Sequence, residues 1–364
     1  MDVADLTREL VAIPSHDDET AAGDYVEAWL REHTDAAVER DEHGNVFARR
    51  GAGEESLALA GHHDVVAPDA SQVEGDDVAP ESDYTLEERD GRLYGRGTAD
   101  MKGCQAAAMC AFRDADPDDL DCELVFASFV EEESGALGSE KAVDDGFAPD
   151  YAVVGEGSTG YSADGVTDVA VAHKGRRGST VTARGTAAHA SEAEKGENAV
   201  YAATDAIELL RDMEVPETEV LGHELEGSVV VTEIEGGSAW NVVPERCEIT
   251  VDERTVPGER APLEWVETYE NVAWTVDQDL EPMACGDEAF ADLALEVAAA
   301  EQDGDPEHVV KPHATDAGNL AQAGADCLVI GAAEPGEAHT ADESVSLDVL
   351  DRCYRIYRGI AESL

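Results

Sequence analysis

Four short runs of almost purely apolar residues constrain the fold of this chain more than any other feature. The runs are Leu57 to Ala60, Leu124 to Val130, Tyr151 to Val154 and Cys327 to Ile330. Runs this short, with no polar face, are typical of strands that are covered on both sides in a mostly parallel sheet. The alanine-rich stretch from Met101 to Phe112 predicts a helix between two of them. We therefore expect an α/β fold with a mostly parallel open sheet and helices on both faces.

The middle of the chain has a different pattern, which predicts a second domain of the α+β type. Strands are expected at Ser179 to Ala183, Ser228 to Ile234, Cys247 to Asp252 and Val272 to Val276, and helices at Glu197 to Met213 and Pro262 to Glu270. This βαββαβ order is the ferredoxin-like arrangement. We predict a catalytic domain formed by residues 1–175 and 283–364, interrupted by an inserted lid domain at residues 176–282.

The charge of the chain limits its partners and its surroundings. The 364 residues include 24 Lys and Arg against 83 Asp and Glu, which gives a formal net charge of −59. A surface this negative repels nucleic acids and anionic membranes. Its self-repulsion is largely screened in molar salt, where the Debye length falls to ~3 Å. We therefore expect a protein of a halophile's high-salt cytoplasm. The high charge does not predict disorder, because 43% of the residues are hydrophobic, which is enough to fill a core.

The sequence predicts neither a secretion signal, nor a membrane span, nor a disulfide framework. The N-terminal sequence MDVADLTREL is acidic and lacks the apolar region of a signal peptide. No apolar run approaches the ~18 residues that a membrane span needs. The seven cysteines are an odd number without a C-x-x-C pair, which is typical of a reducing compartment. A soluble, cytoplasmic protein is expected.

Histidines and carboxylates follow the four apolar runs. His62 follows the first run, Glu131 to Glu133 the second and Glu156 the third, while His339 lies shortly beyond the fourth. Asp100 lies in a glycine-rich turn before the predicted helix. Ligands of open α/β sheets bind at the carboxyl ends of the strands, so these side chains are expected to converge. Such a set predicts two divalent ions that share a carboxylate; we expect zinc, and cobalt or manganese could use the same donors.

Each of these residues taken singly favours a plainer interpretation. A single strand-end histidine is more often a core residue, and a glutamate triplet in so acidic a chain is more often on the surface. Recurrence after every apolar run is what favours the metal site. The remaining histidines without metal-like company are expected in structural or surface positions: His16, His33, His43, His223 and His308.

The motifs around the expected site resemble those of one enzyme family. In chain order they are G-H-x-D-V-V from Gly61, G-R-G-x-x-D-M-K-G from Gly95, E-E-x-G from Glu132, G-E from Gly155 and A-H-T-x-x-E from Ala338. They resemble the dinuclear zinc amidohydrolases that include acetylornithine deacetylase, succinyl-diaminopimelate desuccinylase and glutamate carboxypeptidase. The inserted domain has matching motifs too: H-K-G from His173, G-x-x-A-H from Gly185, G-x-N-A from Gly196, G-G-x-x-x-N-V-V-P from Gly236 and D-x-R from Asp252.

This resemblance implies a set of metal ligands. Asp100 would bridge two metal ions. His62 and Glu156 would complete the coordination of one ion, and Glu133 and His339 that of the other.

The resemblance also implies catalytic and substrate-binding roles. Glu132 would be the general base on the metal-bridging water, and Asp64 would hydrogen-bond His62 and fix its tautomer. His189 would stabilise the oxyanion. Asn241 and Arg254 would hold the substrate, with Arg254 as a bidentate carboxylate clamp.

Two departures from the family pattern affect these assignments. Where the family usually has D-E-E, this chain has E-E-E from Glu131, and Gly135 sets the register in which Glu132 is the base. Where the family usually has G-E-P-T, this chain has G-E-G-S from Gly155. The second departure leaves the shape of that loop open, although the ligand Glu156 is present.

The resemblance implies metal-dependent hydrolysis of the amide bond of an N-acyl amino acid. The reaction would be that of succinyl-diaminopimelate desuccinylase or acetylornithine deacetylase, in lysine or arginine biosynthesis. Two alternatives stay open: a metallo-dipeptidase or carboxypeptidase of the same family, and a non-catalytic binding protein of that fold. The partners expected are a small N-acyl amino acid or short peptide and a second copy bound through the lid. Whether His313, close to Asp316, touches the substrate is left open.

Overall fold

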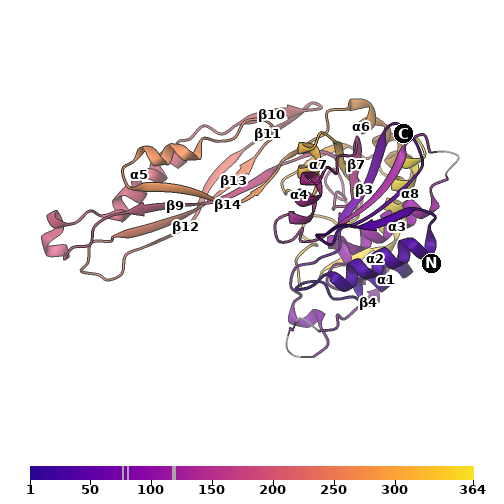
Figure 1. The fold of residues 1–364 in the computed structure, drawn as a ribbon, viewed down its shortest axis with the longest axis horizontal. Coiled ribbons are helices and arrows are strands. Elements are labelled where there is room, and N and C mark those ends of the chain that lie inside the picture. The colour runs from indigo at the N-terminus through magenta and orange to yellow at the C-terminus, as the bar shows by residue number, and fades with distance from the viewer. Residues whose placement is uncertain (76–77, 80–81, 117–119) are drawn as a thin grey trace. The chain divides into compact units, whose positions relative to one another are not determined.

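The computed structural model describes residues 1–75, 78–79, 82–116 and 120–364, and it divides them into two compact units (Figure 1). The first unit contains Met1–His173, Met283–Lys311 and Thr315–Leu364. The second contains Lys174–Pro282 together with the short segment Pro312–Ala314. The chain therefore leaves the first unit after His173 and returns to it at Met283.

The first unit is built on a mixed sheet whose centre is parallel. Its strands are β1 (Ala37–Arg40), β2 (Val46–Arg50), β3 (Ser56–His62), β6 (Glu123–Phe129), β7 (Tyr151–Val154), β8 (Val169–His173), β15 (Met283–Ala284), β16 (His308–Lys311) and β17 (Asp326–Val329). The order is β1-β2-β6-β3-β7-β17-β8-β15, and β16 also pairs with β8. The β6, β3, β7 and β17 neighbours are parallel, whereas β1, β2 and β15 pair antiparallel at the edges. This confirms the predicted mostly parallel α/β sheet.

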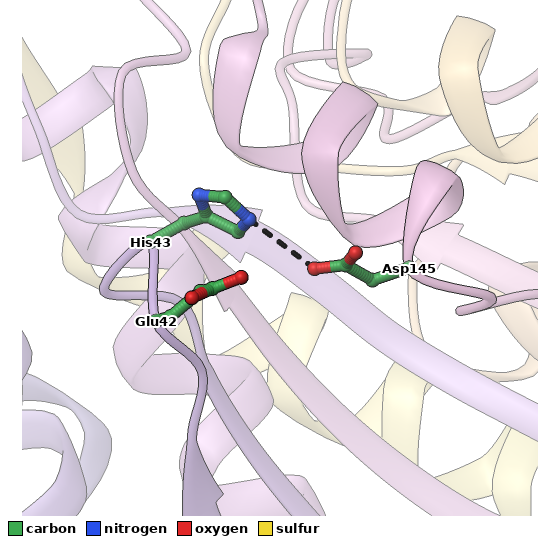
Figure 2. A group of neighbouring side chains, drawn as sticks. All are labelled: Glu42, His43 and Asp145. Atoms are coloured by element: carbon green, nitrogen blue, oxygen red, sulfur yellow. Dashed lines mark hydrogen bonds and ion pairs between the residues drawn. The ribbon is translucent and has the colours of Figure 1, made fainter.

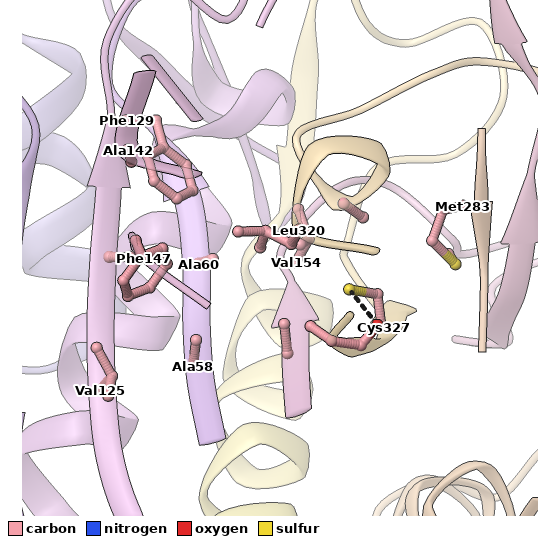
Figure 3. Packing of buried hydrophobic residues seen from close by; sticks show 14 of the residues in the cluster. Ala58, Ala60, Val125, Phe129, Ala142, Phe147, Val154, Met283, Leu320 and Cys327 are labelled. Carbon is pink, nitrogen blue, oxygen red and sulfur yellow. Dashed lines mark hydrogen bonds between the residues drawn. The ribbon is translucent and has the colours of Figure 1, made fainter. Parts of the chain in front are cut away.

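Helices cover both faces of this sheet. They are α1 (Val3–Val11), α2 (Thr20–His33), α3 (Gly103–Asp114), α4 (Leu137–Asp144), α6 (Glu288–Ala300), α7 (Ala317–Gln322) and α8 (Leu347–Ala361). On one face α4 and α7 join a cluster of buried residues that includes Phe129, Phe147 and Leu320 (Figure 3). On the other face α3 packs against α1 and α8, and every residue of α3 from Gly103 to Phe112 is buried. The strands formed by the apolar runs are covered by helices on both sides, which explains why these runs have no polar face.

The second unit is a four-stranded antiparallel sheet with helices on it. Its elements are β9 (Gly175–Arg184), α5 (Ala199–Arg211), the hairpin β10 (Glu217–Val220) and β11 (His223–Glu226), β12 (Ser228–Gly236), β13 (Arg246–Thr255) and β14 (Val272–Leu280). The sheet order is β12-β13-β9-β14. Inward-facing residues of β9 and β13, such as Val181 and Ile249, pack on Ala203 of α5.

Three local features of the second unit differ from the sequence prediction. The helix expected from Glu197 starts at Ala199, because the Asn198 side chain accepts from the Val200 backbone N–H at 2.9 Å and caps it. The helix expected at Pro262 to Glu270 is only a 3-10 segment at Leu263–Thr268. The β10–β11 hairpin was not predicted, because its charged strands lack an apolar pattern.

Smaller elements complete the fold. A three-stranded sheet is formed by β18 (Ser344–Ser346), β5 (Arg92–Tyr94) and β4 (Glu87–Arg89). Short 3-10 segments lie at Ala70–Gln72 and Ala190–Lys195, and an irregular helical turn at Thr98–Lys102. All seven cysteines are buried free thiols. Within the part of the chain that the structure describes, no helix has both the length and the apolar character needed to cross a membrane.

Candidate metal and catalytic site

The order of the central strands brings three of the predicted side chains to one edge of the sheet. His62 is the last residue of β3, the glutamate triplet follows β6, and Glu156 is the second residue after β7. Because β3 lies between β6 and β7 and is parallel to both, their carboxyl ends meet at the same edge. The sheet register therefore explains why residues far apart in the sequence converge there.

The first group of converging side chains is formed by His62, Asp100 and Glu156. The buried His62 Nε2 lies 3.2 Å from Asp100 Oδ1 and 3.1 Å from Glu156 Oε1. One ligand atom from each residue lies within 4.8 Å of the others, so the three could hold a metal ion. The other ring nitrogen of His62, Nδ1, lies 3.0 Å from the Asp64 backbone oxygen, which orients the ring.

The second group shares Asp100 with the first. His339 Nε2 lies 3.0 Å from Asp100 Oδ2 and 3.1 Å from Glu133 Oε2, and these three residues could also hold a metal ion. Each oxygen of Asp100 thus faces a different histidine. His339 lies in a turn at φ 62°, a left-handed conformation that is uncommon for a residue other than glycine.

The donor chemistry and the charge of this arrangement fit two divalent cations. Imidazole nitrogens and carboxylate oxygens are the donors of zinc sites, and cobalt or manganese bind the same set. Hydrogen bonds that His339 donates to the Asp100 and Glu133 carboxylates raise its pKa to about 10, so the site attracts positive charge. Although burial opposes the shift, His339 and His62 hold the pKa of Asp100 well below its ordinary value. The five predicted ligands therefore form two donor groups that share Asp100.

Asp64 joins the two strand ends behind this site. Its carboxylate accepts the backbone N–H of Glu132 at 3.1 Å and of Glu133 at 3.0 Å, and it lies 3.3 Å from His62 Nδ1. A single buried carboxylate therefore orients the histidine that ends β3 and the backbone that follows β6.

We expect Asp64→Asn to weaken metal binding by about 10- to 100-fold, the usual effect of losing an outer partner of a ligand. The amide can accept fewer of these hydrogen bonds, and its NH2 group would face a backbone N–H. Equilibrium dialysis with metal analysis measures the change. Glu296→Gln on α6 removes an exposed carboxylate and serves as the control; equal affinities in the two variants would contradict a specific role for Asp64.

Glu132 is the carboxylate placed beside the first donor group. Its Oε2 lies 4.0 Å from His62 Nε2, and its backbone is held by Asp64. Burial raises the pKa of Glu132 well above its ordinary value, and the nearby Asp316 and Glu156 carboxylates add to this effect. The neighbouring Glu131 instead forms an ion pair with Lys141 at 2.9 Å and is 42% exposed.

Sequence reasoning missed a buried ion pair that supports Asp100. Arg96 pairs with Glu343, and both side chains are almost fully buried. Glu343 Oε1 also accepts the backbone N–H groups of Ala99 at 3.0 Å and Asp100 at 3.2 Å. Arg96 and Glu343 stand inside the quoted motifs, but only the fold shows that they contact each other. A second omission is Asp316, a buried carboxyl whose pKa burial raises to about 7.

The loop that carries Glu156 has a fixed shape despite its G-E-G-S sequence. A Cβ at Gly155 would lie 2.7 Å from Met101 Cε, and one at Gly157 would lie 2.7 Å from the Ala333 Cβ. The buried Lys311 Nζ donates to the Gly157 oxygen at 2.5 Å. Glycine at both positions therefore permits close packing on either side of Glu156.

Three predicted residues belong to the second unit. His189 is exposed, and its Nε2 lies 3.5 Å from Asn241 Nδ2. The guanidinium of Arg254 donates from Nε to Asp252 Oδ1 at 2.8 Å, and Asp252 also accepts from Arg176 at 2.8 Å. The structure thus brings His189 and Asn241 together, whereas Arg254 is engaged by Asp252 instead. His313, exposed, lies in the short segment that groups with this unit.

A further group of metal-ligand residue types lies on the surface of the first unit. His43 Nε2 lies 3.2 Å from Asp145 Oδ2, with Glu42 beside it (Figure 2). The prediction that His43 lacks metal-like company is therefore wrong, because Asp145 reaches it from the end of α4. Glu42 and Asp145 are exposed, and exposed carboxylates around a histidine are expected in a chain with 83 acidic residues. We interpret this group as a surface hydrogen bond between His43 and Asp145.

Comparisons with known proteins agree with the fold and the site. Residues 58–363 match the model of Peptidase family M20/M25/M40, and the chain belongs to this family. It is therefore a hydrolase that acts on amide bonds. It is 30% identical over 340 residues to the acetylornithine deacetylase of Myxococcus xanthus, covering 88% of this chain and 83% of that protein. Similarity to acetylornithine deacetylases of two Pectobacterium strains and Proteus mirabilis spans only 53–54% of those proteins.

Solved structures share the fold along the whole chain. Aminopeptidase PepT from Bacillus cereus superposes with a TM-score of 0.78 at 19% identity, covering 99% of this chain and 97% of that one. The Bacillus subtilis YXEP protein, described as a dinuclear metal binding peptidase from the M20 family, gives 0.68 at 15% identity, with 99% and 96% covered.

Proposed function

We propose that this protein hydrolyses the amide bond of an N-acyl amino acid, with N-acetylornithine as the first candidate. The observation that carries the proposal is the shared Asp100, whose two oxygens face two separate histidine and carboxylate groups. The relatives named acetylornithine deacetylase favour that substrate over N-succinyl-diaminopimelate. A metallo-dipeptidase or carboxypeptidase remains the second candidate, because solved structures of this fold include peptidases.

In the proposed mechanism, His62, Asp100 and Glu156 would hold one divalent ion, and Asp100, Glu133 and His339 would hold the other. Bound there, such ions lower the pKa of water and polarise the amide carbonyl; zinc is the ion that we propose.

Glu132 is the proposed general base. It takes the proton from the attacking water and returns it to the leaving amine. Burial raises the pKa of its carboxyl, which lets the group hold that proton between the two steps. Asp64 keeps Glu132 and His62 in fixed positions through its hydrogen bonds.

Three residues of the second unit are proposed to act on the substrate. His189 stabilises the oxyanion of the tetrahedral intermediate, and Asn241, whose side chain lies beside it, orients the acyl amino acid. Arg254 binds the substrate carboxylate; since Asp252 now occupies its guanidinium, the substrate would have to exchange with or share that contact.

The test is hydrolysis of N-acetylornithine, N-succinyl-diaminopimelate and a dipeptide, measured side by side in about 2 M KCl with and without chelator. We expect N-acetylornithine to have the highest kcat/KM and chelator to abolish its turnover. Preferred cleavage of the dipeptide would favour the peptidase alternative. Two bound ions without turnover of any amide would favour a non-catalytic protein.

We also propose that the protein forms a homodimer through the second unit. β12 is an edge strand of its sheet, and it exposes Val230 and Ile234, while α5 exposes Tyr201. An exposed edge with apolar side chains is a surface that other chains can pair with. Sedimentation equilibrium at high salt tests this proposal, and a monomer there would reject it.

A halophilic, cytoplasmic setting is proposed from the net charge of −59. On transfer from about 2 M to about 0.1 M KCl, the Debye length grows from below ~3 Å to ~10 Å, so repulsion between surface carboxylates increases. We expect the melting temperature to fall by roughly 10 °C or more, equivalent to several kcal/mol for a chain of this size. Differential scanning calorimetry measures it.

Sucrose provides the control for the salt experiment. It stabilises folded proteins by exclusion from their surface but does not screen charge. If sucrose at low salt restores the melting temperature as fully as KCl does, charge screening is not the cause.

A further inference from the structure

A buried lysine, Lys311, lies close to the proposed metal site. It is the last residue of β16 and is only 4% exposed. Burial lowers the pKa of Lys311, and the Glu156 and Asp100 carboxylates oppose this shift. An ammonium group that interacts with these two carboxylates also repels the divalent ion that they are proposed to bind. The charge of Lys311 is therefore a disadvantage for metal binding, and its role has to come from the contact that its side chain makes.

Lys311 contacts the backbone that carries Glu156. Its Nζ donates to the Gly157 carbonyl oxygen at 2.5 Å. The N–H of the same peptide group belongs to Ser158, and it donates to the Gly331 oxygen at 3.0 Å. The peptide group that directly follows Gly157 is thus held at both of its polar ends, one residue beyond the proposed ligand.

Gly157 itself provides little restraint for this loop. Glycine has more conformational freedom than any other residue, and the site does not admit a larger one. A Cβ at Gly157 would lie 2.7 Å from both the Cβ and the backbone oxygen of Ala333. The proline that the family usually has at this position fixes φ, but here it would meet the same two atoms. The backbone after Glu156 therefore depends on hydrogen bonds for its shape, and the one from Lys311 is among them.

We propose that Lys311 is a positioning residue for one of the two metal positions. By holding the peptide group after Gly157, it fixes the backbone from which Glu156 joins the first donor group. The inference rests on the proposed function, in which the first and second donor groups each hold one ion. It deepens that function because it makes the two positions unequal: Lys311 acts on the first and not on the second.

The first measurement is the affinity for each ion in Lys311→Met, which keeps a side chain of similar length without the ammonium group. Equilibrium dialysis at one high salt concentration gives the two dissociation constants. We expect one of them to increase on the order of 10-fold and the other to stay within about twofold, as for a partner that supports one ligand. Loss of the positive charge alone would strengthen cation binding, so a weaker affinity distinguishes positioning from a simple effect of charge.

The second measurement is hydrogen exchange in the metal-free protein, which needs neither ions nor activity. Because the Gly157 carbonyl loses its partner in Lys311→Met, we expect the amides of residues 155–160 to exchange on the order of 10-fold faster. Strand β2 should exchange as in the wild type, which shows that the fold is intact. Lys311→Gln keeps a donor on a shorter side chain and should give intermediate results. It replaces Lys311→Met if that variant no longer protects β2.

Lys141→Met is the matched control, because it removes another lysine of the first unit, one that is 38% exposed and pairs with Glu131. Its affinities and its exchange should equal those of the wild type. Combining Lys311→Met with Glu133→Gln identifies the position affected. We expect the double variant to bind neither ion tightly, whereas one tightly bound ion would place both effects at the second position and contradict the inference.

Tighter metal binding in Lys311→Met with unchanged exchange of residues 155–160 would also overturn the inference, because it would reduce the role of Lys311 to its charge. Two unchanged dissociation constants would do the same. If the wild type binds two ions and hydrolyses an amide, these results count against this inference alone. If the wild type binds no ion, the proposed function fails and this inference fails with it.

Discussion

Glu132→Gln is expected to lower kcat by about 10³-fold, within the range of ~10²–10⁴ that a positioned general base contributes. The amide has nearly the same size as the carboxylate but cannot take a proton from water. Because Glu132 is not one of the proposed ligands, the variant should retain both ions. Steady-state kinetics with N-acetylornithine, together with metal analysis of the same sample, measures both properties.

Glu131→Gln is the matched control for this experiment. Glu131 is the preceding residue of the same triplet, but it is paired with Lys141 and 42% exposed. Its substitution should leave kcat within about twofold, since surface ion pairs contribute little. If Glu131→Gln lost activity and Glu132→Gln did not, the assignment of the base would be one residue out of register.

Asp100→Asn is expected to remove both ions and to reduce activity to the background. Asp100 Oδ1 lies 3.2 Å from His62 Nε2 and Oδ2 lies 3.0 Å from His339 Nε2, so one carboxylate belongs to both donor groups. An amide offers one good donor oxygen, and it also lacks the negative charge between two cations. The loss of metal affinity should exceed the ~10- to 100-fold loss expected when a residue that only hydrogen-bonds a ligand, such as Asp64, is replaced.

Metal content after dialysis, measured by mass spectrometry, tests the shared role of Asp100. Glu133→Gln is the comparison. Because Glu133 belongs to the donor group with His339, we expect this substitution to lower mainly the affinity for one of the two ions. Two tightly bound ions in Asp100→Asn would contradict the shared-ligand arrangement. Circular dichroism of each variant confirms that the fold is intact before the metal counts are compared.

Much of the first unit could be predicted because burial leaves a direct mark on the sequence. The runs at Leu57, Leu124 and Tyr151 lack a polar face because helices cover both sides of their strands, and they appear as β3, β6 and β7. The side chains after these strands converge because parallel neighbours end at one edge. The position of His62 relative to Glu156 therefore followed from the fold class.

Contacts that depend on chain segments far apart could not be predicted in this way. The pairing of Arg96 with Glu343 joins a glycine-rich turn to a residue near the C-terminus, and neither has a sequence signal for the other. Asp145 reaches His43 only because α4 ends beside the turn between β1 and β2. The β10–β11 hairpin is set by its turn, where Leu221 and Gly222 both have positive φ, rather than by an apolar pattern.

The position of the ligands along the chain has a consequence for how the site is assembled during synthesis. His62, Asp100 and Glu156 all precede the second unit in the sequence, and they are carried by strands and turns of the first. His339 follows the second unit, on an exposed turn near the C-terminus. Glu343, which accepts the backbone N–H of Asp100, also follows the second unit, as do β17 and α8 of the first unit, so neither donor group is supported until the C-terminal segment has been made. A chain truncated before His339 lacks Glu343 and α8 as well, so it should bind neither ion tightly.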